Sequence, residues 1–124
     1  LISRAIPFVE LVSYYMAADV AWITPLADGM NLVCKEFVAS RLDGDGVLIL
    51  SEFAGAAVEL GDAVTANPFS HRSMDGAIRA ALDMPEDERR GRMAGLRRAV
   101  RENDVRSWSP GSLTLVRSKV APAA

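Results

Sequence analysis

The segment 24–38, TPLADGMNLVCKEFV, joins a predicted strand to a predicted helix. The run before it, 20–23, is short and continuously apolar, which is typical of a strand covered on both faces. A proline, an acid and a glycine follow, and residues 31–42 are helical by composition and by their apolar spacing. A strand, a short loop and a helix form the repeating unit of a parallel α/β sheet.

The same alternation continues on both sides of this segment. A first helix is predicted over 8–18. A second has Ser73 as its N-cap and Ile78 and Leu82 on one face. A third begins at Pro85, and a last helical segment covers 109–120. Two further strands are predicted over 47–50 and 63–67, with a short helical segment over 56–60 between them. We therefore predict an α/β fold with a doubly wound parallel sheet, Rossmann-like, in a single domain over 1–124 whose C-terminal helices occupy 85–120.

Composition restricts the class of protein. The chain has 124 residues, half of them hydrophobic, and a net charge of −2, which gives no electrostatic reason to expect a nucleic acid or membrane partner. It contains no apolar run of about 20 residues and no signal-peptide pattern at Leu1, so a cytoplasmic location is predicted. The single cysteine, Cys34, excludes an internal disulfide and is predicted to be a buried small hydrophobe. The start at Leu1 instead of Met suggests a piece of a longer polypeptide.

A binding site is predicted where the strands end, because ligands of open parallel sheets bind at the carboxyl edge. The loops 25–31, 51–55 and 67–73 lie there, and the first is the strongest candidate. Gly29 lets a ligand approach the backbone, and the amides of residues 30–33 at a helix start suit phosphate or sugar oxygens. Asp28 could accept hydrogen bonds from sugar hydroxyls, and Glu36, two turns along the helix from Gly29, suits a vicinal diol such as a ribose.

A purely structural interpretation remains open on spacing alone. In it, Asp28 or Asn31 is only an N-cap and Glu36 is a solvated acid. No P-loop, G-x-G-x-x-G or G-x-S-x-G motif occurs, so a diphosphate site would depend on helix amides, and a dehydrogenase half is disfavoured. The only histidine, His71, cannot build a zinc site without further ligands, and no carboxylate pair shows the spacing of metal ligands.

The remaining candidates favour structural roles. The arginine-rich run 88–101 is predicted to be a solvated amphipathic face over a stripe of Met93, Leu96 and Val100. Trp22 and Trp108 are predicted to be core or packing residues, and Glu52 and Glu59 have no role that the pattern decides.

The blocks ADVAWITPLADGMNLVCKEFVA, GVLILSEFAGAAVEL, NPFS, AIRAALDMPEDERRGRM and DVRSW occur in this order along the chain. In them the chain resembles the C-terminal half of the trehalose-6-phosphate synthase family, retaining glucosyltransferases with two Rossmann domains. The resemblance covers about residues 6–115. It implies a single half of a two-domain glycosyltransferase that binds a nucleotide-diphosphate glucose as substrate, with no cofactor and no metal.

The resemblance also implies roles for individual residues. Asp28 and the backbone of Gly29, Met30 and Asn31 would hold the glucose, the amides of Leu32 and Val33 the diphosphate, and Glu36 the ribose. Family members carry arginine where this chain has Ala27, which leaves the orientation of Asp28 in question. The catalytic residues, the acceptor pocket and the main cations for the diphosphate would lie in the N-terminal half that precedes Leu1, so the fragment alone would be inactive.

The segments ISRAIPF, VCKEFVA and NPFSHRSMDGAI are most similar to the glucosylglycerol-phosphate synthase branch of the family. That branch transfers glucose from ADP-glucose to glycerol 3-phosphate, in the synthesis of a compatible solute. The alternatives are transfer from UDP-glucose or another nucleotide-glucose to glucose 6-phosphate, as in trehalose-6-phosphate synthases, and a non-catalytic sugar-nucleotide-binding module. A homo-oligomer is compatible with either, because a sheet short of its early strands leaves an open apolar edge.

Overall fold

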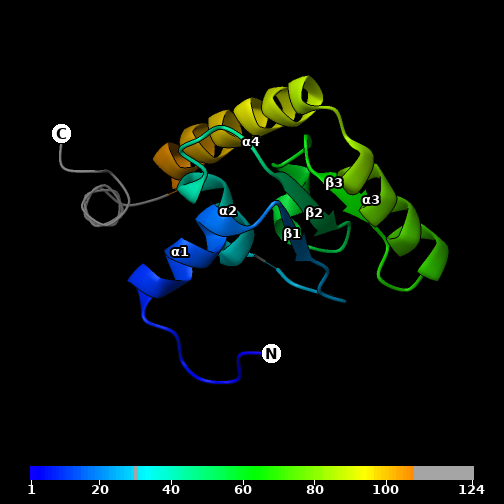
Figure 1. The fold of residues 1–124 in the computed structure, drawn as a ribbon, viewed down its shortest axis with the longest axis horizontal. Coiled ribbons are helices and arrows are strands. Elements are labelled where there is room, and N and C mark those ends of the chain that lie inside the picture. Colours follow the sequence, from blue (N-terminus) through cyan, green and yellow to red (C-terminus); the bar gives the residue numbers. More distant parts are fainter. Residues whose placement is uncertain (30, 108–124) are drawn as a thin grey trace.

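The computed structural model describes residues 1–29 and 31–107 and contains one parallel sheet, shown in Figure 1. Its strands are β1 (Val20–Ile23), β2 (Val47–Ser51) and β3 (Val64–Ala66), in the order β1-β2-β3. Val20 pairs with Val47, and Ile49 pairs with Val64. The predicted α/β class and parallel pairing are confirmed.

Helices connect the strands and lie on both faces of the sheet. They are α1 (Phe8–Ala17), α2 (Leu32–Ser40), α3 (His71–Asp83) and α4 (Glu86–Ser107), with a 3₁₀ turn, η1 (Gly55–Val58), after β2. The helices α2 and α4 pack on one face together with η1, and α3 packs on the other. The helix α1, which precedes β1, packs against α2, which follows it.

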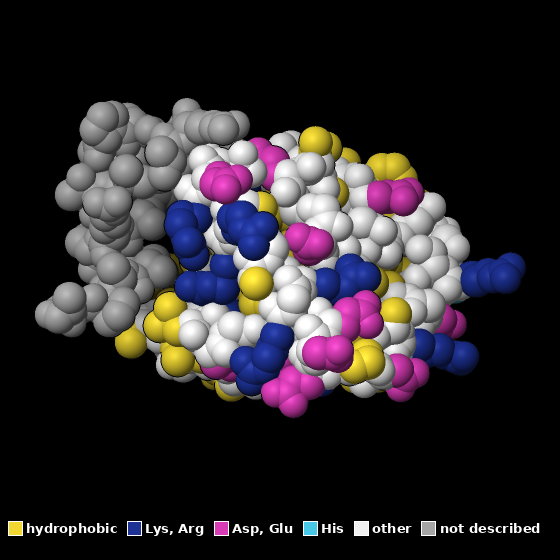
Figure 2. Space-filling view, turned by 90° about the horizontal axis from the view of Figure 1, so that it is seen from above, with side chains coloured by type: hydrophobic (Ala, Val, Ile, Leu, Met, Phe, Trp, Pro, Cys, Tyr) yellow, Lys and Arg dark blue, Asp and Glu magenta, His cyan; other side chains and the backbone are white. Residues whose placement is uncertain are grey.

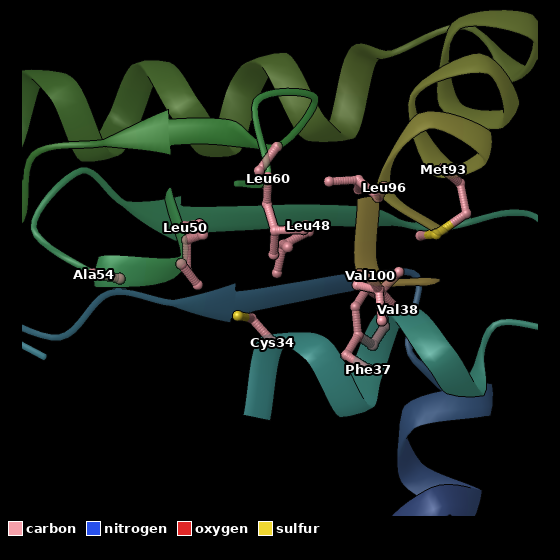
Figure 3. Close-up of a cluster of buried hydrophobic side chains, with 12 residues drawn as sticks. Cys34, Phe37, Val38, Leu48, Leu50, Ala54, Leu60, Met93, Leu96 and Val100 are labelled. Carbon is pink, nitrogen blue, oxygen red and sulfur yellow. The ribbon is translucent and has the colours of Figure 1, made fainter. Parts of the chain in front are cut away.

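The central strand β2 supplies both halves of the core. Leu48 and Leu50 point into the α2–α4 layer, whereas Val47 and Ile49 point toward α3, because successive side chains of a strand alternate between its faces. Figure 3 shows the first of these clusters. All five residues of β2 are buried, which explains why the first four, 47–50, form an uninterrupted hydrophobic run.

Two predictions about the core are confirmed. Met93, Leu96 and Val100 form the buried stripe of α4, at most 7 % exposed. Cys34 is fully buried, and its thiol donates a hydrogen bond to the carbonyl oxygen of Asn31 at 3.0 Å. Burial raises the pKa of the thiol to about 11, so this cysteine is protonated at neutral pH and is not a nucleophile.

The predicted N-cap of α3 is wrong by three residues. The helix begins at His71, and its N-cap is Ser70, whose side chain accepts the Ser73 amide at 3.1 Å. The Ser73 hydroxyl instead accepts the amide of Asn67 and holds the loop after β3 against the helix. Leu82 is 69 % exposed, because the face that α3 buries is formed by two alanines and two partly buried neighbours: Ala77, Ala81, Met74 and Ile78.

The prediction of a core position for Trp22 is also wrong. Trp22 is 45 % exposed, because in the described part of the chain β1 is an edge strand paired with β2, and α3 packs on β2 and β3. The segment predicted as a helix over 56–60 is a single 3₁₀ turn that ends at Val58. The predictions for Trp108, the helix over 109–120 and Met30 lie outside the described residues.

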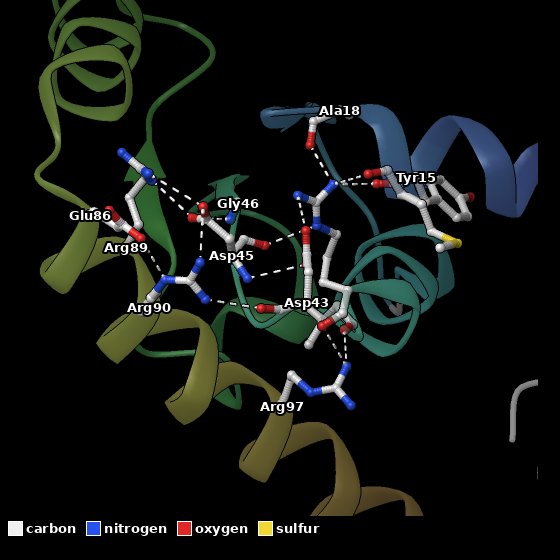
Figure 4. A network of polar contacts seen from close by, with 12 residues as sticks. Tyr15, Ala18, Asp43, Asp45, Gly46, Glu86, Arg89, Arg90 and Arg97 are labelled. Carbon is white, nitrogen blue, oxygen red and sulfur yellow. Dashed lines mark hydrogen bonds and ion pairs between the residues drawn. The ribbon is translucent and has the colours of Figure 1, made fainter. Parts of the chain in front are cut away.

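A polar network that the sequence pattern did not indicate joins α1, α2 and the loop 43–46 (Figure 4). Arg41, at the end of α2 and 5 % exposed, donates to the carbonyl oxygens of Tyr15, Met16 and Ala18 at 2.6–2.8 Å. Its Nε donates to the Asp45 carbonyl at 2.9 Å. One buried guanidinium therefore satisfies the last carbonyls of α1 and fixes where β1 begins.

The arginine-rich helix α4 is only partly the solvated face that was predicted. Arg90 and Arg92 form exposed i,i+4 ion pairs with Glu86 and Glu88, and Figure 2 shows basic and acidic side chains interleaved on one face of the molecule. Arg97, however, donates to three carbonyl oxygens at the C-terminus of α2, those of Val38, Ala39 and Arg41. Arginines of α4 therefore also join it to α2.

Arg89 of α4 forms an ion pair with the loop 43–46, and this pair predicts a pH dependence of stability. Its guanidinium lies 2.9 Å from Asp45 and lowers the pKa of that carboxyl from its ordinary value of 3.8 to about 2. A depressed pKa in the folded state stabilises the fold above the ordinary pKa, and this stabilisation disappears as the pH falls from about 4 to about 2.

In urea titrations, Arg89→Met should therefore be less stable than the wild type at pH 7, and the difference in stability should shrink as the pH falls from about 4 to about 2. A difference that is the same at pH 7 and pH 2.5 would contradict the assignment.

Candidate functional site

The loops that follow β1 and β2 meet at the carboxyl edge of the sheet. Asp28 and Ala54 form an isolated parallel bridge, and the Gly55 amide donates to the Asp28 carbonyl oxygen at 2.7 Å. The backbone at Asp28 is therefore held by the start of η1. Two of the three predicted loops are brought together by main-chain contacts.

Two glycines in these loops play different roles. A Cβ on Gly55 would lie 2.8 Å from the carbonyl carbon of Gly29 and closer still to its oxygen, so the approach of the loops requires a residue without a side chain at Gly55. A Cβ on Gly29 would meet nothing within 4 Å, and its φ is not in the left-handed region. The fold itself therefore does not need a glycine at Gly29, which leaves open space beside the start of α2.

The N-terminus of α2 is capped by Asn31. Its Oδ1 accepts the Cys34 amide at 2.9 Å, and its Nδ2 donates to the carboxylate of Asp28 at 3.1 Å. The N-cap interpretation is thus correct for Asn31, whereas Asp28 orients the capping amide. The Asn31 side chain accepts a hydrogen bond from the Cys34 amide and not from the amides of Leu32 and Val33. Both of these residues are 46 % exposed.

Glu36 lies on the face of α2 that is turned toward α1. Its Oε2 accepts a hydrogen bond from the Tyr15 hydroxyl at 3.0 Å, and the residue is partly buried. Burial and then the adjacent carboxylate raise the pKa of the Tyr15 phenol, so the phenol remains a donor at neutral and mildly alkaline pH. Glu36 is therefore not the freely solvated acid of the structural interpretation.

The neighbouring Lys35 points to a different element. Its ammonium lies 2.8 Å from the Glu59 carboxylate just after η1, and the lysine side chain is only 11 % exposed. This ion pair gives Glu59 a structural role that its sequence position did not reveal. It also joins α2 to η1, the same two elements that frame Asp28 and Gly29.

Two other candidate residues, His71 and Glu52, are exposed. His71 lies in the first turn of α3, and Glu52 lies in the loop after β2. Phe53 and Phe69 form an edge-to-face pair with ring centroids 5.5 Å apart, which connects the second and third loops.

Within residues 1–29 and 31–107, no group of three or more His, Cys, Asp or Glu side chains could hold a metal ion. No helix in this part of the chain is long and apolar enough to cross a membrane.

Comparison with curated proteins reveals close relatives. The chain is 50 % identical over 109 residues to a glucosylglycerol-phosphate synthase from Picosynechococcus sp., a match that covers 88 % of this chain and 22 % of the relative. It is 52 % identical over 106 residues to a trehalose-6-phosphate synthase from Mycobacterium sp., covering 86 % of this chain and 22 % of the relative. The chain thus spans about a fifth of the length of these relatives.

A solved structure has the same fold. Trehalose-6-phosphate synthase from E. coli, determined bound with UDP-2-fluoro glucose, matches with a TM-score of 0.81 and 36 % identity over 92 % of this chain and 26 % of its own. The family model that describes glycosyltransferase family 20 matches residues 1–117. The predicted Rossmann-like class and the resemblance stated from the sequence are both confirmed, and the chain belongs to glycosyltransferase family 20.

Proposed function

We propose that this chain is the nucleotide-sugar half of a retaining glucosyltransferase. The observation that carries the proposal is the start of α2, where Asn31 caps the Cys34 amide and leaves the amides of Leu32 and Val33 beside the open space at Gly29. Such amides, with the helix dipole behind them, bind phosphate oxygens. Membership of family 20, and the nucleotide sugar bound to the E. coli relative, support the same assignment.

Each residue near α2 then has a defined part in binding. The Asp28 carboxylate and the backbone of Gly29, Met30 and Asn31 hold glucose hydroxyls, and the amides of Leu32 and Val33 meet the diphosphate. Glu36 accepts hydrogen bonds from the ribose hydroxyls, one turn further along the same helix. The contacts of Asp28 with Asn31 and Gly55 support this division, because they orient the carboxylate and the backbone that the glucose would meet.

The same groups contribute to the reaction itself. As the glucosyl bond breaks, negative charge develops on the leaving diphosphate, and helix-start amides stabilise that charge without reorganising. The acceptor attacks from the face that the nucleotide leaves, as expected of a retaining enzyme. The catalytic residues, the acceptor pocket and the cations that complete the diphosphate site would come from the remainder of the polypeptide.

We propose ADP-glucose as donor and glycerol 3-phosphate as acceptor, which makes the enzyme a glucosylglycerol-phosphate synthase. The choice rests on the segments ISRAIPF, VCKEFVA and NPFSHRSMDGAI, because overall identity is almost equal for the two kinds of synthase, 50 % and 52 %. Transfer to glucose 6-phosphate is the second candidate, favoured by the relative from Mycobacterium sp..

A transfer assay of the complete polypeptide that carries this chain tests the proposal. ADP-glucose and UDP-glucose are each combined with glycerol 3-phosphate and with glucose 6-phosphate, and the products are separated by chromatography. Of these four combinations, we expect only ADP-glucose with glycerol 3-phosphate to give product. Product with glucose 6-phosphate would assign trehalose-phosphate synthesis instead. Nucleotide-sugar binding without transfer in any combination would favour a non-catalytic module, in which Ala27, exposed in the first loop, replaces the arginine of the family.

Gly29→Ala should separate binding from folding. Apart from the residues next to it in sequence, the added methyl meets no atom of residues 1–29 and 31–107 within 4 Å, so the urea midpoint should change little. The methyl would, however, occupy the space where the sugar approaches the backbone, and we expect the Kd for the nucleotide sugar to rise about tenfold or more. Calorimetric titration measures this. An unchanged Kd in the folded variant would place the sugar elsewhere.

A further inference from the structure

The side chain of Tyr15, on α1, reaches the predicted binding face of α2. Its hydroxyl donates to Oε2 of Glu36 at 3.0 Å across 21 residues of sequence, and the bond is partly buried. A glutamate side chain has three rotatable bonds, and holding one oxygen removes much of that freedom before a ligand arrives. The second oxygen, Oε1, is then presented in one orientation.

The position of Tyr15 is itself fixed from both ends of the residue. Its ring meets Phe37 edge-on, with centroids 6.4 Å apart and planes at 79°. Its carbonyl oxygen accepts a hydrogen bond from Arg41 at 2.8 Å, and Arg41 is 5 % exposed. The hydroxyl of Tyr15 is therefore attached to a rigid frame formed by the buried end of α2.

We propose that Tyr15 is a positioning residue for nucleotide recognition, which orients the Glu36 carboxylate toward the two ribose hydroxyls. The inference rests on the proposed function, because it requires that Glu36 binds the ribose. Tyr15 makes no contact with the nucleotide in this account and acts only through Glu36. A preorganised carboxylate binds a vicinal diol more tightly than a mobile one, since less side-chain entropy is lost on binding.

The test uses ribose hydroxyls as the readout, because a merely structural role for Tyr15 would not depend on them. ADP and 2′,3′-dideoxy-ADP are titrated calorimetrically into the complete polypeptide, as wild type and as Tyr15→Phe. The phenylalanine keeps the edge contact with Phe37 and removes only the hydroxyl. We expect ADP to bind about fivefold more weakly to the variant, whereas the Kd for the dideoxy nucleotide should be unchanged.

Two further variants make the result interpretable. Tyr14→Phe removes the same atom from the neighbouring residue, which is 46 % exposed, and should bind both nucleotides as the wild type does. Glu36→Gln should lose the preference for ADP over the dideoxy nucleotide, and adding Tyr15→Phe to it should cause no further loss, because the two residues act as one unit.

The outcomes separate the inference from the proposed function. If Glu36→Gln loses the preference for ADP but Tyr15→Phe changes both nucleotides equally, or neither, the positioning role is overturned and the ribose site stands. If Glu36→Gln keeps the full preference for ADP, the ribose assignment fails and the role of Tyr15 fails with it.

Discussion

Arg41→Met is expected to lower the free energy of unfolding by about 3–5 kcal/mol, the largest effect of any single substitution considered. The buried guanidinium donates to four carbonyl oxygens, those of Tyr15, Met16, Ala18 and Asp45, at 2.6–2.9 Å. Methionine fills a similar volume but donates nothing, so all four carbonyl oxygens would lose this hydrogen-bond donor. Urea denaturation followed by circular dichroism measures the loss.

Arg41→Lys is the matched variant for this prediction. An ammonium keeps the positive charge but cannot reproduce a planar fork that serves carbonyls of α1 and of the loop 43–46 together. We expect the lysine variant to be destabilised by about half as much as the methionine variant. Equal stability of the lysine variant and the wild type would show that charge alone, and not the fork, maintains this junction.

Gly55→Ala is expected to lower the free energy of unfolding by about 2–4 kcal/mol, because its methyl would collide with the carbonyl oxygen of Gly29. Main-chain atoms cannot move aside as the end of a flexible side chain can, so the loops must separate. The hydrogen bond from the Gly55 amide to Asp28, 2.7 Å long, would then be lost. We therefore expect the variant to lose nucleotide-sugar affinity as well.

The control for this prediction is Gly61→Ala. A Cβ at Gly61 would meet nothing within 4 Å, and its φ is not left-handed, so alanine should be neutral or slightly stabilising there. Both variants are compared by urea denaturation and by calorimetric titration with the nucleotide sugar. If Gly55→Ala matched Gly61→Ala in both measurements, the close approach of the two loops would not be needed for the site.

The sheet and the start of α2 could be predicted from the sequence because their signals are local. The run 47–50 is apolar without interruption, as a central strand buried on both faces must be, and an Asn immediately before a helical stretch is a common N-cap. The start of α3 could not be fixed from the sequence because two serines and an asparagine, Ser70, Ser73 and Asn67, can each cap a helix, and Ser70 takes that position.

The residues that the sequence did not reveal act over long distances along the chain. Arg41 binds carbonyl groups 23–26 residues before it, and an arginine at a helix end ordinarily predicts solvent exposure. Tyr15 lies in the helix predicted over 8–18, but its hydroxyl meets Glu36 only when α1 packs on α2. The separate roles of Gly55 and Gly29 likewise become visible only when the two loops are placed side by side.

The most direct test of the central claim, that the start of α2 binds a nucleotide sugar, is calorimetric titration of ADP-glucose and UDP-glucose into wild type and Glu36→Ala. Removing a carboxylate that accepts ribose hydroxyls should weaken binding about 10- to 100-fold, while the circular dichroism spectrum is retained. Glu102→Ala, an exposed acid on α4, is the control and should bind as the wild type does. An unchanged Kd in folded Glu36→Ala would contradict the account.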